Sequence, residues 1–221
     1  GLLVVAAIGV YPLITTIRPQ LFSLLLYTIL FALLNGVGRG RWRLFLWMPV
    51  VFALWANLHG GWIVGLGVLG LWSACALLAR TITWPWAAGG TLLALLGTLA
   101  TPYGVELWGF LGETVGLGRA DIQDWQPLVY WPSHLIAWTV TAALIVVAWR
   151  RRGRAAAALL IPAAALGMLT LRVARIEGFF ALTTVILLAP CFAAFGPERL
   201  RLSRRPGCLC PRQRRRHRVQ R

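Results

Sequence analysis

Two aspartates, Asp121 and Asp124, lie three positions apart in the longest polar stretch of the chain, residues 101–134. In a helical turn this spacing would place both carboxylates on one face, where they could hold a divalent cation or supply a general base. The same stretch contains four of the six carboxylates in the sequence. If the protein carries out acid–base chemistry, we expect the catalytic groups to lie in this stretch. The alternative is a solvated loop whose acids only keep it out of an apolar environment.

Three arginines form a second group of candidate residues, Arg18, Arg172 and Arg175. Guanidinium groups bind phosphate through paired hydrogen bonds, so three of them at one face of a membrane could hold a lipid-linked phosphate or diphosphate. Glu177 follows Arg175 by two residues. Pairing with this carboxylate, or with lipid headgroups, is the competing interpretation, and the sequence leaves both open.

His59 lies between two apolar runs, two residues after Asn57 and directly before Gly60 and Gly61. Polar side chains at the edge of a membrane are costly and are often functional, which makes His59 a candidate site residue. The alternative is a capped turn. In that case Gly60 takes the left-handed conformation that ends one helix, and the next helix begins two residues later.

The composition indicates where these residues are placed. Hydrophobic residues make up 59% of the 221, charged residues make up 13%, and the mean hydropathy is +0.73. A water-soluble domain of this composition would have too little polar surface to cover itself. The apolar runs approach the roughly 20 residues that a helix needs to cross a bilayer, and no strand-like alternation is present. We therefore expect an all-α, polytopic bundle of transmembrane helices.

About eight spans are expected. We expect these spans to form a transmembrane helical domain over residues 1–196, with an outer loop at 101–134. A basic, disordered cytoplasmic tail is expected over residues 197–221. The chain opens within an apolar run, so we expect a fragment whose N-terminal part is missing. The candidate spans are residues 1–17, 21–34, 44–58, 62–79, 86–100, 135–149, 155–171 and 179–195.

The arginines are distributed unevenly over the two sides of this bundle. If the turn at residues 35–43 is cytoplasmic, strict alternation places 18 of the 22 arginines on that side. This distribution agrees with the positive-inside rule, so the net charge of +16 reflects membrane topology and we expect no nucleic-acid partner. Five of the six carboxylates then fall on the outer side. The sequence therefore predicts a site that faces outward.

Residues 103–116 have the pattern of a helix that lies in the membrane surface. Glu106 and Glu113 share one side of the helical wheel. The apolar residues gather on the opposite arc, which is typical of an interfacial amphipathic helix. This arc contains Val105, Leu107, Trp108, Leu111 and Val115.

Five motifs follow one another in a particular order. They are RPQLFSLLL from Arg18, WANLHGGWIVGLG from Trp55, TPYG from Thr101, DWQP from Asp124 and RVARIEGFFAL from Arg172. In this order they resemble the C-terminal two-thirds of a group of bacterial polytopic proteins similar to the GT-C superfamily of membrane glycosyltransferases. The resemblance covers about residues 18–190, and WANLHGG is its most specific part.

The resemblance implies a multi-pass enzyme of the bacterial inner membrane whose active site faces the periplasm. Such an enzyme moves a sugar from a polyprenyl-phosphate donor to an acceptor. The outer loop with acidic motifs that these proteins carry near the N-terminus is not found in this chain, so the expected fragment lacks the N-terminal catalytic loop. A transporter or flippase, and a non-catalytic membrane subunit that scaffolds partners, are the alternatives from other classes.

The resemblance also implies roles for the candidate residues. Asp121 and Asp124 would shape the catalytic site or hold a divalent cation. His59 would orient the acceptor or the donor phosphate. The residues that would neutralise charge on the departing lipid phosphate are Arg18, Arg172 and Arg175.

Overall fold

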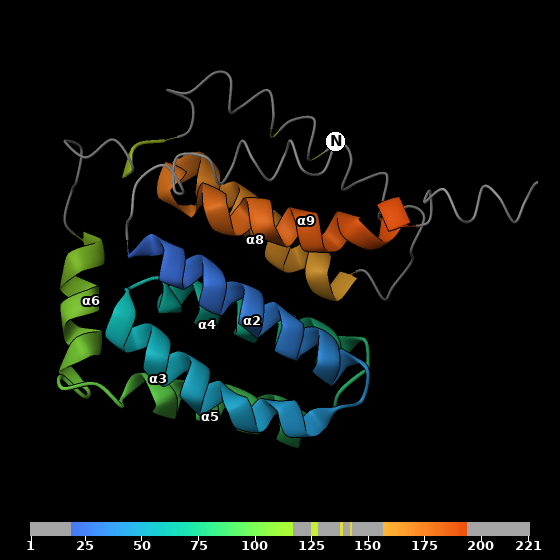
Figure 1. The fold of residues 1–221 in the computed structure, drawn as a ribbon, viewed down its shortest axis with the longest axis horizontal. Coiled ribbons are helices and arrows are strands. Elements are labelled where there is room, and N and C mark those ends of the chain that lie inside the picture. Colours follow the sequence, from blue (N-terminus) through green and yellow to red (C-terminus); the bar gives the residue numbers. More distant parts are fainter. Residues whose placement is uncertain (1–18, 117–124, 128–137, 139–141, 143–156, 194–221) are drawn as a thin grey trace, which may run out of the picture.

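The computed structural model describes residues 19–116, 125–127, 138, 142 and 157–193 (Figure 1). In this part of the chain the secondary structure is helical and contains no strand, so the predicted all-α class is confirmed for it. The predictions that lie outside the described residues concern Arg18, Asp121, Asp124, the span at 1–17, most of the span at 135–149 and the tail at 197–221.

Six of the predicted spans coincide with helices to within about four residues. A short 3-10 helix, η1, leads directly into α3, and a second, η5, joins α8 to α9. The bounds are α2 Gln20–Gly38, η1 Trp42–Trp47, α3 Met48–Leu58, α4 Trp62–Leu78, α5 Trp84–Thr98, α6 Glu106–Gly116, α8 Ala157–Arg172, η5 Ala174–Ile176 and α9 Glu177–Ala193.

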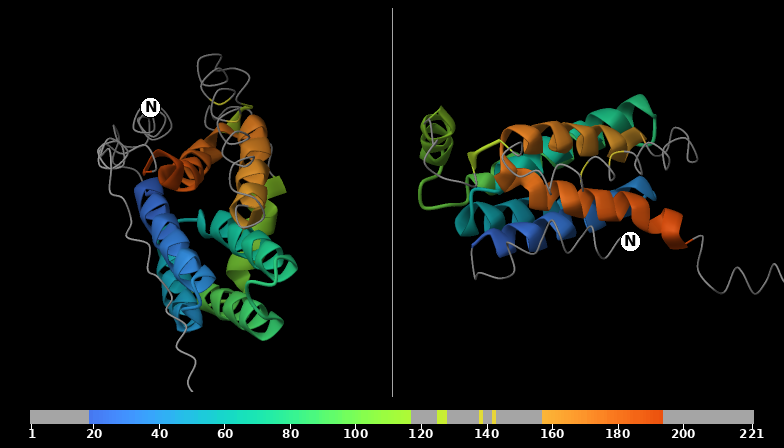
Figure 2. Two further views of the ribbon diagram at one scale, coloured as in Figure 1. Left: turned by 90° about the vertical axis from the view of Figure 1, so that its right-hand side faces the viewer. Right: turned by 90° about the horizontal axis from the view of Figure 1, so that it is seen from above.

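The α-helices other than α6 lie side by side along one long axis, and α6 lies across one end of them (Figures 1 and 2). Within the described residues, α2 alone has both the length and the apolar composition needed to cross a bilayer. It has 19 residues and a mean hydropathy of 2.0. At 1.5 Å per residue this helix spans about 28 Å, close to the thickness of a hydrocarbon core. The apolar helices Trp42–Leu58, Trp62–Leu78 and Leu160–Arg172 are shorter.

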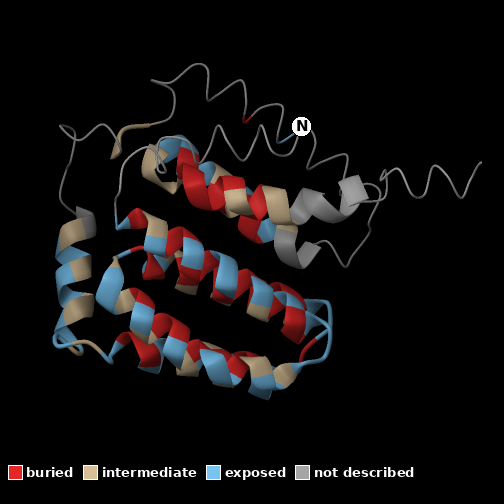
Figure 3. Cartoon of the chain, in the orientation of Figure 1, coloured by how far each residue is buried: buried red, intermediate tan, exposed pale blue. Residues whose placement is uncertain are grey.

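Aromatic side chains fill the core between α2, α3 and α9. Tyr27 is fully buried and meets the rings of Phe31 and Phe179 edge to face, with centroids 5.0 and 4.9 Å apart. Its hydroxyl lies 2.7 Å from the Thr183 hydroxyl, a buried hydrogen bond that joins α2 to α9. Buried residues line the facing sides of the helices, as Figure 3 shows. This core fixes how the connections at the bundle ends are placed.

Two glycines allow close helix packing. A Cβ atom at Gly97 of α5 would lie 2.5 Å from the carbonyl oxygen of Pro49 in α3, so the two backbones touch. A Cβ atom at Gly65 of α4 would lie 2.5 Å from the Trp55 ring. Small residues at helix contacts are typical of membrane bundles, where packing replaces the hydrophobic effect as the source of attraction between helices.

The connections separate into two groups at opposite ends of the bundle (Figure 1). The turns at 39–41 and 79–83 lie at one end, where Arg39, Arg41 and Arg80 are exposed. Gly40, with φ of +86°, forms the sharp turn after α2. The connections at 59–61, 99–105 and 173–176 lie at the other end. The described helices therefore alternate in direction, as the assignment of the arginines to the two sides assumes.

Helix α6 has the predicted two faces over most of its length. Glu106 and Glu113 are exposed. Val105 is 73% exposed and precedes the helix, which begins at Glu106, so it is not part of the face that packs against the core. The side chain of Val115 lies outside the described part. The residues that pack against the core are Leu107, Trp108 and Leu111.

Candidate functional site

His59 ends α3 in an extended conformation, with φ of −166° and ψ of 144°. Its amide donates a hydrogen bond to the carbonyl of Trp55, 3.0 Å away. Among the described glycines only Gly40 and Gly104 have positive φ, so the prediction of a left-handed Gly60 is wrong. The extended backbone of His59, and not a left-handed Gly60, ends α3 and redirects the chain. The prediction that the next helix begins two residues later is confirmed, because α4 starts at Trp62.

The imidazole of His59 connects three helices. Its Nδ1 lies 2.7 Å from the Ser23 hydroxyl of α2, and the amide of Gly61 donates to the same nitrogen over 3.1 Å. The Ser23 oxygen also accepts a hydrogen bond of 2.8 Å from the indole of Trp55 in α3. The ring is therefore held from α2, from α3 and from the start of α4.

The second ring nitrogen faces Arg175. A terminal nitrogen of its guanidinium lies 3.3 Å from Nε2 of His59. Each ring nitrogen has a neighbour that can only donate, the Gly61 amide beside Nδ1 and Arg175 beside Nε2. A protonated ring would face a donor at both nitrogens, whereas a neutral ring accepts from one of them, so this environment favours the neutral imidazole. Burial lowers the pKa of His59 below its ordinary value of 6.5, and the positive charge of Arg175 lowers it further. At pH 7 this lowered pKa favours the neutral form of His59.

Arg175 is oriented from α2 and from the segment at 125–127. With the Gln20 amide turned so that its oxygen faces the guanidinium, that oxygen accepts hydrogen bonds from Nε over 3.2 Å and from a terminal nitrogen over 3.1 Å. The guanidinium lies over the Trp125 ring, 5.8 Å from its centroid. The amide of Ala174 also donates to the carbonyl of Gln126 over 3.0 Å. These contacts fix the plane of the cation.

A cavity of about 20 Å³ opens beside these groups. A volume of this size holds roughly one water molecule or one ligand oxygen and cannot hold a sugar ring, so a larger ligand would have to lie outside it. Both polar and apolar residues line this cavity. The lining residues are Gln20, Ser23, Leu24, His59, Arg175, Gly178 and Phe179.

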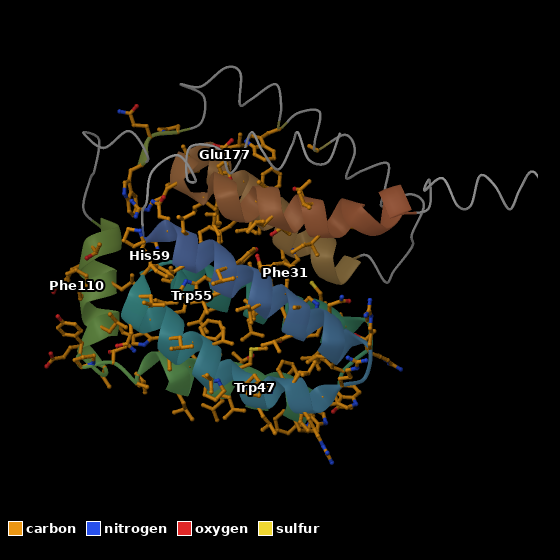
Figure 4. All side chains as sticks on the ribbon, in the orientation of Figure 1. Phe31, Trp47, Trp55, His59, Phe110 and Glu177 are labelled. Carbon is orange, nitrogen blue, oxygen red and sulfur yellow. The ribbon has the colours of Figure 1, made fainter. Side chains whose placement is uncertain are left out.

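Glu177 lies at the same end of the bundle as His59, at the first turn of α9 (Figure 4). Its side chain is buried, and its Oε1 accepts a hydrogen bond of 2.6 Å from the indole of Trp138. A carboxylate in the first helical turn is also stabilised by the helix dipole. This residue therefore links α9 to the segment that contains Trp138.

The structure brings together two of the six predicted site residues, His59 and Arg175. Arg172 is exposed at the last turn of α8, at the same end of the bundle. Arg18, Asp121 and Asp124 lie outside the described residues. No group of three His, Cys, Asp or Glu side chains that could hold a metal occurs in the described ranges. The predicted cation site at the two aspartates stays a prediction.

Sequence reasoning missed Gln20, Ser23 and Trp55 as members of the network. Gln20 and Ser23 are buried, with exposed fractions of 8% and 1%. They are three residues apart at the start of an otherwise apolar helix, and this spacing places them on one helix face. A pair of polar residues on one face of an apolar helix is the signal that could have identified them.

The five motifs meet at this end of the bundle. RPQLFSLLL contributes Gln20 and Ser23, WANLHGG contributes Trp55 and His59, and RVARIEG contributes Arg175. DWQP contributes the Trp125 ring beneath Arg175. The Asn57 amide donates 2.8 Å hydrogen bonds to the carbonyls of Ala53 and of Ala100, the residue before TPYG. Motifs distant in sequence therefore form one contiguous region.

Comparisons of the chain with protein-family models, with curated proteins and with solved structures found no match.

Proposed function

We propose that this chain is a membrane-embedded, glycosyltransferase-like protein that binds a polyprenyl-phosphate-linked sugar where His59 and Arg175 meet. The observation that carries the proposal is the placement of Arg175. Its guanidinium contacts the Gln20 amide and the His59 imidazole at one end of an apolar helical bundle. Arginine side chains bind phosphate groups through paired hydrogen bonds. Because the proposed site lies at the surface of a bilayer, a phosphate attached to a lipid is the ligand that we expect there.

The membrane part of the proposal is supported by the outward faces of the helices. No charged residue occurs within residues 44–58, 62–78 or 84–98. Large apolar side chains are nevertheless exposed on α2, α3, α5 and α8, where a protein in water would carry polar groups. Exposed apolar side chains of four helices include Phe22 and Leu25 of α2, Val50 and Leu54 of α3, Leu92 and Leu96 of α5, and Met168 and Leu169 of α8.

The orientation follows from the two ends of the bundle. We place the end with Arg39, Arg41 and Arg80 in the cytoplasm of a bacterial cell, by the positive-inside rule. The end with His59 and Arg175 then faces the periplasm. Helix α6 lies across this end with Glu106 and Glu113 exposed, which suits a helix at the membrane surface.

The proposed reaction is a direct displacement at the anomeric carbon of the donor sugar. An acceptor hydroxyl forms the new C–O bond, while the bond from that carbon to the lipid phosphate breaks and the phosphate leaves with the electron pair. A carboxylate, Asp124 or Asp121, accepts the hydroxyl proton. Arg175 and Arg172, with Arg18, stabilise the negative charge that grows on the phosphate. Trp125, which follows Asp124 in sequence, contacts Arg175 and so links the two groups of residues.

A transfer assay on the full-length protein tests this proposal. Purified protein in detergent is given a labelled polyprenyl-phosphate sugar and an acceptor, and transfer is measured for the wild type, Arg175→Ala and Asp124→Asn. We expect both variants to lose about tenfold or more of the rate. Arg39→Ala is the matched control, because it removes an arginine from the opposite end. Wild-type rates from both site variants would remove the assigned roles.

A further inference from the structure

We propose that Gln20 and Ser23, in the first two turns of α2, are positioning residues that fix the guanidinium of Arg175 for phosphate binding. The inference rests on the proposed function, and it adds two residues that belong to neither the acidic nor the basic group predicted from the sequence. Gln20 acts on Arg175 directly. Ser23 acts through His59.

Both side chains are buried in an apolar helix, and this location requires an explanation. A polar group buried without a partner is destabilising, so an apolar residue at either position would be the simpler choice if packing were the only requirement. Each has polar partners. Gln20 contacts Arg175 itself, and Ser23 contacts His59, the neighbour of Arg175.

The Gln20 route fixes the plane of the cation. One amide oxygen accepts hydrogen bonds from Nε and from a terminal nitrogen of Arg175, at 3.2 and 3.1 Å. Two contacts to adjacent nitrogens define the in-plane direction of the guanidinium, and the Trp125 ring lies over its face. Gln20 is a neutral acceptor, so a carboxylate in its place would add a negative charge beside Arg175.

The Ser23 route fixes the imidazole that lies beside the cation. The Ser23 oxygen is held by the Trp55 indole at 2.8 Å and lies 2.7 Å from Nδ1 of His59. For Nε2 to accept from Arg175, the ring proton must be on Nδ1, and the Ser23 oxygen can accept a hydrogen bond from it there. With Nδ1 held from α2, Nε2 is directed at Arg175, 3.3 Å away.

Gln20 and Ser23 would make the same contacts if they only stabilised the fold. The test must therefore separate the effect of a variant on folding from its effect on phosphate binding by Arg175. Gln20→Glu does this, since it is nearly isosteric and keeps an acceptor in place while adding a negative charge beside Arg175. Gln20→Leu removes the acceptor. Ser23→Ala removes the hydroxyl, and its matched control is Thr28→Ala, because Thr28 is exposed on the same helix and bonds to the Leu24 carbonyl of that helix.

The measurement is the dissociation constant of the full-length protein for a polyprenyl phosphate in detergent micelles, with the thermal midpoint recorded in parallel. We expect Gln20→Leu to weaken binding about tenfold or more, and Ser23→Ala to weaken it several-fold, because each leaves the cation less well oriented. Thr28→Ala should bind as the wild type does. Gln20→Glu should melt near the wild type and still bind at least about tenfold more weakly.

Two outcomes overturn the inference and leave the proposed function in place. In the first, Arg175→Ala weakens binding while Gln20→Leu and Ser23→Ala match Thr28→Ala. In the second, Gln20→Glu restores both the thermal midpoint and the affinity, which would make Gln20 a structural residue only.

Two other outcomes concern the site itself. Wild-type binding by Arg175→Ala would overturn the proposed function together with the inference. The same binding measurement is repeated with inorganic pyrophosphate, which should bind more weakly than the polyprenyl phosphate. Equal or tighter binding of pyrophosphate would assign the site to free phosphate and overturn the lipid-linked ligand.

Discussion

The guanidinium of Arg175 lies 3.3 Å from Nε2 of His59, although 116 positions separate the two residues in the sequence. A cation next to an imidazole raises the cost of protonating the ring, and burial acts in the same direction. Both effects favour the neutral state of His59 beside Arg175. This coupling makes the stability of the bundle depend on pH.

We expect the wild type to lose stability more steeply than His59→Gln as the pH falls from about 7 to about 5. Below the ordinary pKa of 6.5 the unfolded imidazole binds a proton, whereas the folded one stays neutral until its lowered pKa is reached. The unfolded state then binds more protons, so the free energy of unfolding falls with pH. Thermal midpoints of both proteins, measured in one detergent across this range, check the prediction. Parallel curves would contradict it.

The helices could be predicted because each depends on a local property. In the bilayer proposed for this chain, an apolar run bounded by glycine, proline or arginine specifies a helix without reference to other segments. The runs at 62–79 and 86–100 differ from α4 and α5 by at most two residues at each end. The two faces of α6 were predictable for the same reason, since Glu106 and Glu113 alternate with apolar residues at the helical period.

The network around Arg175 could not be predicted in this way, because it depends on which segments pack together. Ser23 and His59 are 36 positions apart, and their bond exists because α2 packs beside the end of α3. Nothing in the local sequence of Gln20 specifies Arg175 as its partner. The conformation of Gly60 was missed for a related reason, since the tertiary contacts of His59 favour extended geometry at His59 itself.

Gly97→Ala should destabilise the bundle by about 2 kcal/mol or more, because the new methyl group would meet the Pro49 backbone and cannot be relieved by a side-chain rotation. Gly89→Ala, in the same helix, is the control. A Cβ at Gly89 has nothing within 4 Å, so the change should be neutral or should stabilise α5 by up to about 1 kcal/mol. Thermal midpoints of the two variants measure the difference. Equal midpoints would show that α3 and α5 pack less closely than described.

Cysteine labelling of intact cells tests which end of the bundle faces outward. Glu106 and Arg39 are exposed at opposite ends, so each is replaced by cysteine in a protein whose four native cysteines have been changed to alanine or serine. A membrane-impermeant maleimide should label Glu106→Cys and leave Arg39→Cys unmodified until the cells are opened. The reverse pattern would place the site in the wrong compartment and would remove the basis for the sugar-transfer proposal.

Lysine replacements distinguish the roles of the two described arginines at the site. Arg175→Lys keeps the charge, but an ammonium group cannot make both contacts to Gln20 while lying flat over the Trp125 ring. We therefore expect Arg175→Lys to reduce donor affinity and transfer about tenfold. Arg172 is exposed at the end of α8, where either cation suits the helix dipole, so Arg172→Lys should stay within about twofold of the wild type. The opposite order of effects would mean that Arg172, at the exposed end of α8, makes the oriented contact with the phosphate.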